Sequence, residues 1–93
     1  MHAQTENWPP RAVAHVDLDA IAANCRRLLG ELSGDAGLCA AVKADGYGHG
    51  MLPVARAALA GGATRLAVVT VEEAELLARD LQPVRDGAVP VLV

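Results

Sequence analysis

The stretch AAVKADGYGHG, residues 40–50, passes from an apolar run into a loop rich in glycine. The run begins at residue 38 as LCAAVK, and a short, continuous apolar run of this kind predicts a strand covered on both faces of a sheet. It ends on Lys43, an awkward residue for the end of a buried strand. The residues after it predict a loop, because glycines at 46, 48 and 50 allow close backbone approach and positive φ.

Strands and helices are predicted to alternate on both sides of this loop. The predicted strands lie at 11–18, 38–43, 65–70 and 89–93, the first half-buried and the others apolar throughout. Asp17 or Asp19 is expected to cap the first helix, and Pro53 falls in the first turn of the second. The expected inward face of the first helix consists of Leu18, Ile21, Ala22, Cys25, Leu28, Leu29 and Leu32.

The third helix has a clear start. Thr70 and Glu73 have the spacing of a capping box, and this box accounts for Glu73 within an otherwise solvated acidic first turn. The expected inward face consists of Val71, Ala74, Leu77, Ala78 and Leu81. Pro83 and Gly87 predict the turn that follows.

This order of elements predicts an α/β fold with a parallel sheet. A doubly wound open sheet and the opening of a (β/α)₈ barrel both agree with it. The chain stops inside an apolar strand, and a complete barrel needs about 250 residues, so we expect a partial TIM-type barrel with only its first βα units. Residues 1–10 are expected to form a flexible arm, and residues 11–93 the N-terminal portion of the barrel domain.

Composition and charge exclude several functions. The 93 residues carry a net charge of −3 without a basic stripe, so nucleic acid is not an expected partner. No apolar run approaches the roughly 20 residues of a membrane helix, and the first residues lack the features of a secretory signal. Cys25 and Cys39 show no metal or disulfide spacing, so we expect buried free thiols and a reducing, cytoplasmic location.

Lys43 is the candidate catalytic residue, because the functional groups of parallel α/β folds gather at the C-terminal ends of the strands. Burial there would disfavour its ammonium form, and a neutral amine can form a Schiff base, most commonly with pyridoxal phosphate. The Tyr47 hydroxyl and the N-terminus of the next helix could bind a phosphate, and His49 could donate or orient the loop. From spacing alone, a solvated lysine, a tight turn and a structural histidine remain open.

The segment AVKADGYGHG (41–50) closely resembles the pyridoxal-phosphate attachment signature of alanine racemases. The flanking segments HVDLDAIAANCRRL and GATRLAVVTVEEAELLARD are also similar to that family, so the resemblance covers about 11–93. It implies an N-terminal (β/α)₈ barrel, a C-terminal β domain to which the strand at 11–18 would belong, and a homodimer. It further implies that Lys43 carries the cofactor and is one of two bases that move the α-proton, while Tyr47 donates to the cofactor phosphate.

The same resemblance implies that much of the site lies beyond residue 93. The second base would be a tyrosine of the other subunit, and an arginine would face the pyridine nitrogen. We therefore expect interconversion of L-alanine and D-alanine, for peptidoglycan, by the full-length protein, and no activity from this chain alone. Two alternatives stay open: a related barrel racemase for serine or several amino acids, and a non-catalytic α/β module that uses Lys43 as a cation for a phosphorylated ligand.

Overall fold

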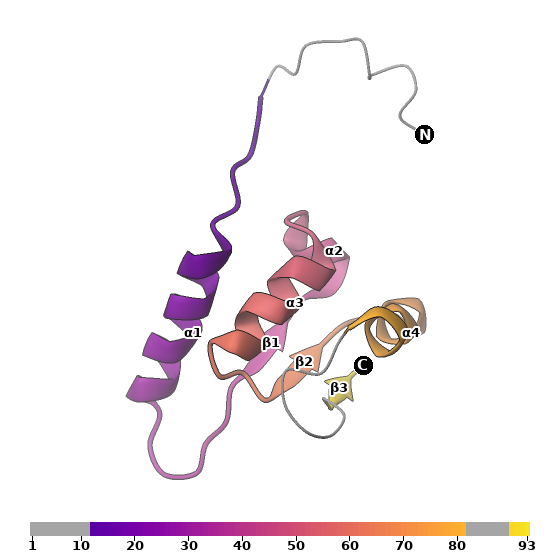
Figure 1. Ribbon diagram of the computed structural model, residues 1–93. Coiled ribbons are helices and arrows are strands. Elements are labelled where there is room, and N and C mark those ends of the chain that lie inside the picture. The colour runs from indigo at the N-terminus through magenta and orange to yellow at the C-terminus, as the bar shows by residue number, and fades with distance from the viewer. Residues whose placement is uncertain (1–11, 82–89) are drawn as a thin grey trace, which may run out of the picture.

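Figure 1 shows the chain as a computed structural model, which describes residues 12–81 and 90–93. The elements are α1 (Leu18–Glu31), β1 (Cys39–Ala41), α2 (Lys43–Tyr47), α3 (Met51–Ala60), β2 (Arg65–Ala67), α4 (Val71–Asp80) and β3 (Val91–Leu92). From the first helix onward, strands and helices alternate as predicted, and α2 is an addition inside the predicted loop. The expected arm at 1–10 and the expected turn at Pro83 and Gly87 lie outside the described residues.

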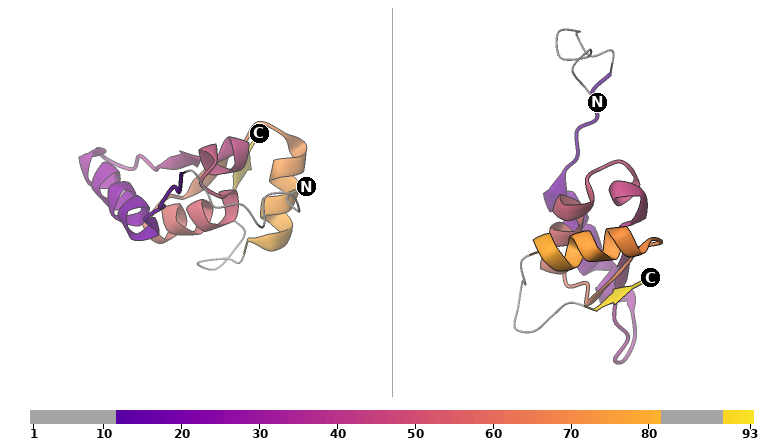
Figure 2. Two further views of the ribbon diagram at one scale, coloured as in Figure 1. Left: turned by 90° about the horizontal axis from the view of Figure 1, so that it is seen from above. Right: turned by 90° about the vertical axis from the view of Figure 1, so that its right-hand side faces the viewer.

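The three strands form one parallel sheet in the order β1-β2-β3. Ala40 pairs with Leu66, and Leu66 pairs with Val91, so residues in register share a face across the sheet. Figure 2 shows α3 and α4 on the same side of this sheet. Strands that follow one another in sequence order, with their helices on one side, wind as a barrel does and do not reverse as a doubly wound sheet does.

The main core lies between the sheet and these helices. Its buried members are Val42, Leu66 and Val68 from the strands and their ends, Met51, Ala55 and Leu59 from α3, and Leu77 from α4. The opposite face of the sheet is open, with Cys39, Ala41 and Leu92 exposed. The prediction that 38–43 is covered on both faces is therefore wrong for the described residues, because the helices cover one side only.

The helix α1 packs against α3 at a point of very close backbone approach. A Cβ at Gly61 would collide with the carbonyl oxygen of Ala22, so this end of α3 requires glycine. Cys25 and Ala58 are buried between the two helices, and burial raises the pKa of the Cys25 thiol. Since Cys39 is exposed, the prediction of buried thiols holds only for Cys25.

Asp17 caps α1 as predicted, accepting a hydrogen bond from the Ala20 N–H at 3.0 Å. The predicted inward face is only partly correct, because Leu18, Leu28 and Leu32 are exposed. On α4, Leu77 is buried as predicted, whereas Val71 and Ala78 are exposed. In both helices, therefore, the other described residues cover only part of the predicted apolar face.

The predicted strand at 11–18 is wrong for the described part, residues 12–17, which form no strand and are exposed. Alternation of apolar side chains predicts which side a strand would bury, but a strand also needs a hydrogen-bonded neighbour. None of the strands in the described part of the chain pairs with this segment.

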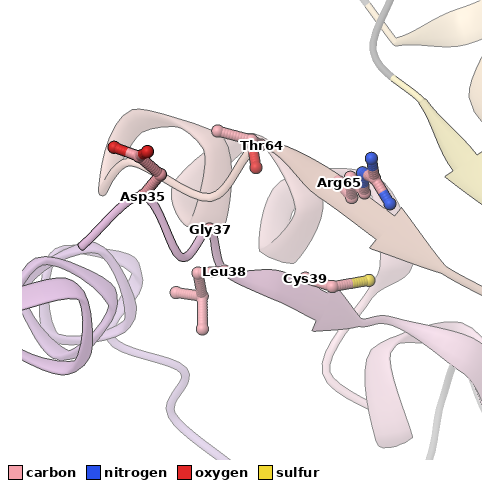
Figure 3. Close-up of a pocket in the computed structure, with 6 residues that line it drawn as sticks. All are labelled: Asp35, Gly37, Leu38, Cys39, Thr64 and Arg65. Atoms are coloured by element: carbon pink, nitrogen blue, oxygen red, sulfur yellow. The ribbon is translucent and has the colours of Figure 1, made fainter. Parts of the chain in front are cut away.

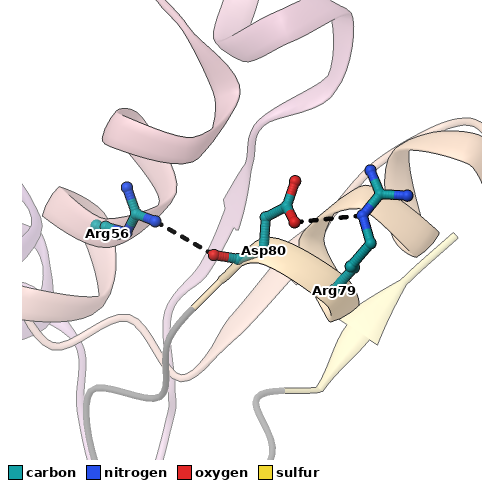
Figure 4. Close-up of polar contacts among 3 residues, drawn as sticks. All are labelled: Arg56, Arg79 and Asp80. Atoms are coloured by element: carbon teal, nitrogen blue, oxygen red, sulfur yellow. Dashed lines mark hydrogen bonds and ion pairs between the residues drawn. The ribbon is translucent and has the colours of Figure 1, made fainter.

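An arginine joins α3 to the end of α4. Arg56 Nη2 donates to the main-chain carbonyl oxygen of Asp80 at 3.2 Å, and Arg79 Nε lies 3.2 Å from the Asp80 carboxylate (Figure 4). The last carbonyls of a helix lack partners within the helix, so Arg56 fills one of these positions from the neighbouring βα unit. This contact holds the C-terminal end of α4 against the middle of α3.

Candidate active site

Lys43 lies at the C-terminal end of β1, and the chain after it winds in a left-handed turn. Ala44, Asp45 and Gly46 have φ and ψ of 52° and 46°, 55° and 45°, and 65° and 36°, and Tyr47 has φ 58°. We call residues 44–47 the left-handed turn. The sequence predicted a loop with positive φ at its glycines, which is confirmed, but positive φ at three other residues was not predicted.

The left-handed turn is strained. Glycine adopts positive φ freely, but Ala44, Asp45 and Tyr47 carry side chains whose Cβ crowds the backbone in this conformation. The cost is roughly 1–2 kcal/mol for each such residue, and therefore roughly 3–6 kcal/mol for the three together. Strain of this kind persists only where the surrounding contacts hold the backbone in place.

Asp45 provides part of that hold by closing the turn onto α3. Its carboxylate Oδ1 accepts a hydrogen bond from the Met51 N–H at 2.8 Å, and its carbonyl accepts one from the Gly50 N–H at 2.8 Å. A negative charge is favourable at a helix N-terminus, and here the protein supplies its own. The Met51 N–H at this N-terminus, which the sequence suggested as part of a phosphate site, is therefore already bonded to the Asp45 carboxylate.

The left-handed turn brings Lys43 and Tyr47 together. The Lys43 Nζ atom lies 5.8 Å from the centroid of the Tyr47 ring, within the range of a cation–π contact. Both side chains are exposed, as is His49. The sequence suggested that Lys43 is buried, but within the described residues it is exposed. It follows the end of β1, and the described residues leave one face of the sheet uncovered.

Glu73 links the connections that follow β1 and β2. Its Oε1 atom accepts from the N–H groups of Val69 and Thr70, both at 3.1 Å, and its Oε2 atom accepts from the Ala44 N–H at 2.8 Å. The capping box predicted from the sequence is confirmed, with the Thr70 hydroxyl accepting from the Glu73 N–H at 3.1 Å. The backbone donors, first Val69 and Thr70 and then Ala44, lower the pKa of Glu73.

The contact from Glu73 to Ala44 was missed from the sequence. The capping-box spacing is a local signal and gives a complete reason for a glutamate at this position. The bond to Ala44 depends on which strands are neighbours, which a local pattern does not report. Only the assumption that β1 and β2 lie side by side could have suggested that their connections touch.

A hollow of about 400 Å³ lies at the other end of the sheet (Figure 3). Its lining residues are Asp35, Gly37, Leu38, Cys39, Thr64 and Arg65, which surround the beginnings of β1 and β2. Functional groups of parallel α/β folds lie at the opposite, C-terminal ends of the strands. Within residues 12–81 and 90–93, no group of three or more histidine, cysteine or acidic residues could hold a metal, and no helix could span a membrane.

The sequence agrees with a known family over most of its length. The family model described as "Alanine racemase, N-terminal domain" matches residues 16–91. The chain belongs to the alanine racemase family. It is 60% identical over 67 residues to the alanine racemase of Mycolicibacterium vanbaalenii, which covers 72% of this chain and 17% of that protein. It is 57% identical over 63 residues to that of Thermobifida fusca, covering 68% of this chain and 17% of the relative.

Solved alanine racemases share the fold. The crystal structure of alanine racemase from E. faecalis superposes with a TM-score of 0.75 at 37% identity, over 85% of this chain and 20% of that one. The Bacillus anthracis enzyme, solved with bound L-Ala-P, gives a TM-score of 0.74 at 39% identity, over 88% and 22%. The N-terminal domain of the family is a TIM barrel, so the expected partial barrel is confirmed. The chain spans about a fifth of each of these two solved chains.

Proposed function

We propose that the whole protein to which this chain belongs interconverts L-alanine and D-alanine with pyridoxal phosphate as its cofactor. The observation that carries the proposal is the position of Lys43, at the C-terminal end of a barrel strand within a chain of the alanine racemase family. The family relation supports the reaction class, and the strand end is where barrel enzymes place their functional groups.

The residues at this edge fit the cofactor chemically. Lys43 offers an exposed primary amine, which can bind an aldehyde carbon covalently, and Tyr47 offers an exposed phenolic hydroxyl that can donate to a phosphate. The left-handed turn places the two side chains beside each other. When bound, pyridoxal phosphate supplies an electron sink for the carbanion that forms when the α-proton leaves.

Racemisation needs a proton removed from one face of the α-carbon and another returned on the opposite face. Lys43 would serve one face, holding or releasing a proton at Nζ, and its exposed position allows that atom to reach a substrate. The base for the other face would come from another part of the whole protein. Tyr47 binds the phosphate and so positions the reacting atoms with respect to Lys43.

The cellular setting follows from this reaction. The product D-alanine would supply peptidoglycan, the enzyme would act in the cytoplasm, and the active unit would be a homodimer in which the second base comes from the partner. Since this chain carries only one of the two bases, we expect the 93-residue chain alone not to racemise alanine.

Covalent trapping tests the proposal directly. Borohydride reduces a lysine–cofactor Schiff base to a stable amine, and Lys43 is the only lysine in this chain. We expect reduction of the whole protein, purified with pyridoxal phosphate, to label the peptide that contains Lys43. A label confined to peptides outside this chain would show the proposal to be wrong. Turnover of a panel of amino acids by the same preparation distinguishes alanine from serine or broad specificity.

A further inference from the structure

The carboxylate of Glu73 makes one contact outside its own βα unit, besides those to Val69 and Thr70 at the start of α4. A capping box needs the glutamate side chain to accept from the N-cap N–H, which here belongs to Thr70. The bond to Thr70 uses Oε1, at 3.1 Å, and leaves Oε2 for a different partner. That partner is the Ala44 N–H at 2.8 Å, which belongs to the neighbouring βα unit.

Ala44 is a sensitive place for such a bond. It directly follows Lys43 and opens the left-handed turn, with φ 52°, a conformation that alanine adopts reluctantly. Later parts of the turn are fixed from within, where the Gly46 N–H donates to the Val42 carbonyl at 2.9 Å and Asp45 binds Met51. The bond from Glu73 instead holds the first residue of the turn from outside.

The acceptor carries a full charge at neutral pH. Its three backbone donors lower the pKa of Glu73, with the Val69 N–H first among the causes, so the carboxylate is ionised under ordinary conditions. Hydrogen bonds to an ionised acceptor are shorter and about twice as strong as bonds between neutral groups. The shortest of the three is the one to Ala44.

We propose that Glu73 is a positioning residue for Lys43, which holds Ala44 in its left-handed conformation and thereby fixes the direction in which the lysine amine leaves the sheet. This inference rests on the proposed function, because a fixed direction matters only if the amine must meet a cofactor and one face of a substrate. Glu73 would act on the amine only through its bond to Ala44. Without its bond, Ala44 can return to negative φ, and the peptide after Lys43 then rotates.

Glu73→Gln separates this role from helix capping. Glutamine is an accepted capping-box residue, so its carbonyl oxygen can still accept from Thr70, but its amide nitrogen cannot accept from Ala44. In the whole protein we expect Glu73→Gln to raise the dissociation constant for pyridoxal phosphate about tenfold, as the loss of a charged hydrogen bond allows. Hydrogen exchange at the Ala44 amide should speed up by a similar factor.

Thr70→Ala is the matched control. It weakens the same capping box from the other side, by removing the hydroxyl that accepts from the Glu73 N–H, and leaves the bond from Glu73 to Ala44 intact. We expect the cofactor dissociation constant of Thr70→Ala to stay within about twofold of the parent value, since a cap acts on helix stability. Equal losses in both variants would mean that Glu73 acts only as a cap, and would overturn the inference.

Rescue by glycine provides a second, independent readout. If Glu73 acts by holding Ala44 at positive φ, then glycine at position 44 removes the strain and reduces the need for the bond. We expect Glu73→Gln combined with Ala44→Gly to recover most of the lost cofactor affinity. If Glu73→Gln alone does not fold, the double variant can be compared with Ala44→Gly alone. A cofactor affinity tenfold lower in the double variant than in Ala44→Gly would refute the inference that Glu73 acts by holding Ala44 at positive φ.

The two proposals fail in different ways. A parent protein whose Lys43 is not labelled by reduction overturns the proposed function and this inference with it. This inference alone is overturned if the parent protein is labelled at Lys43 but Glu73→Gln changes neither the cofactor affinity nor the hydrogen exchange of the Ala44 amide.

Discussion

The connection from β1 to α3 and the connection from β2 to α4 both lead from the end of a parallel strand into a helix. The first uses residues 42–50 and has positive φ at Ala44, Asp45, Gly46, Tyr47, Gly48 and Gly50. The second uses only residues 68–70, none of which has positive φ, and ends in an extended Thr70 that caps α4. One connection is long and strained, and the other is short and relaxed.

The strained connection is the one that carries the candidate site residues. The strained connection places Lys43 and Tyr47 beside each other, with the lysine Nζ atom 5.8 Å from the centroid of the tyrosine ring. The relaxed connection carries no candidate catalytic residue, but Glu73, in the first turn of the helix that follows it, accepts a hydrogen bond from Ala44 at the start of the strained one. The cost of the unusual backbone is thus met partly by a neighbouring unit whose own geometry is ordinary.

The largest effect is expected from the residue that the strained connection presents. Lys43→Arg keeps the positive charge but cannot form a Schiff base, so racemisation by the whole protein should fall by about 10³-fold or more. The melting temperature of the cofactor-free protein should change little, because the side chain is exposed. Racemisation is measured by polarimetry and melting by calorimetry.

Arg79→Ala is the control for Lys43→Arg. Its side chain is 70% exposed on α4, and within residues 12–81 and 90–93 its one polar contact is to Asp80, so removal of this cation should leave racemisation unchanged. A Lys43→Arg protein that still racemised alanine, or that bound a phosphorylated ligand as well as the parent, would favour the non-catalytic module.

The next largest effect is expected from glycine positions inside the strained connection. Gly46 and Gly48 both have positive φ, so a side chain at either position would be strained. A Cβ added at Gly46 would also lie 3.3 Å from Val54 Cγ2, whereas a Cβ added at Gly48 would meet nothing within 4 Å. Gly46→Ala should therefore cost about 2–3 kcal/mol, from backbone strain and crowding together, and Gly48→Ala about 1–2 kcal/mol from strain alone. Hydrogen exchange over residues 43–54 of the whole protein measures both, and equal costs would show that Val54 gives way.

Much of the architecture was predictable because it is encoded in local patterns. The alternation of apolar runs and amphipathic helices predicted the parallel sheet. The cap of α1 lies at Asp17, one of the two residues predicted for it, and the box at Thr70 lies at the predicted residue. These signals involve residues within one turn of each other. The predicted strand at 11–18 was wrong for residues 12–17, because a strand also depends on a hydrogen-bonded partner strand, which a local pattern does not report. None of the described strands pairs with this segment.

The site was only partly predictable. The strand-end position of Lys43 and the positive φ of the loop glycines followed from the sequence, and the pairing of Lys43 with Tyr47 agrees with their expected common role. Positive φ at Ala44 could not be predicted, because alanine normally avoids it. The non-local bond from Glu73 to Ala44 stabilises that conformation, and a sequence pattern does not contain such bonds.

A smaller effect is expected from the relaxed connection. Thr70→Ala removes one half of the capping box and should lower the stability of the first turn of α4 by about 1 kcal/mol. Asp17→Ala removes the cap of α1 and should have a similar effect on that helix, which makes it a matched control. Hydrogen exchange of the first-turn amides reports each loss. Faster exchange at Ala44 in Thr70→Ala than in Asp17→Ala would show that the two connections are coupled through the cap itself.

The smallest effect is a dependence on pH, and it tests the link between the two connections. Backbone donors lower the pKa of Glu73 from its usual 4.5, so the folded form favours the carboxylate. A group with a lowered folded pKa contributes stability above its unfolded pKa and loses that contribution as the pH falls through the folded value. The Ala44 amide resonance should therefore shift with a midpoint below 4.5, and Glu73→Gln should abolish this shift. A midpoint at or above 4.5, or a shift that persists in Glu73→Gln, would mean that the charge of Glu73 does not hold the strained connection.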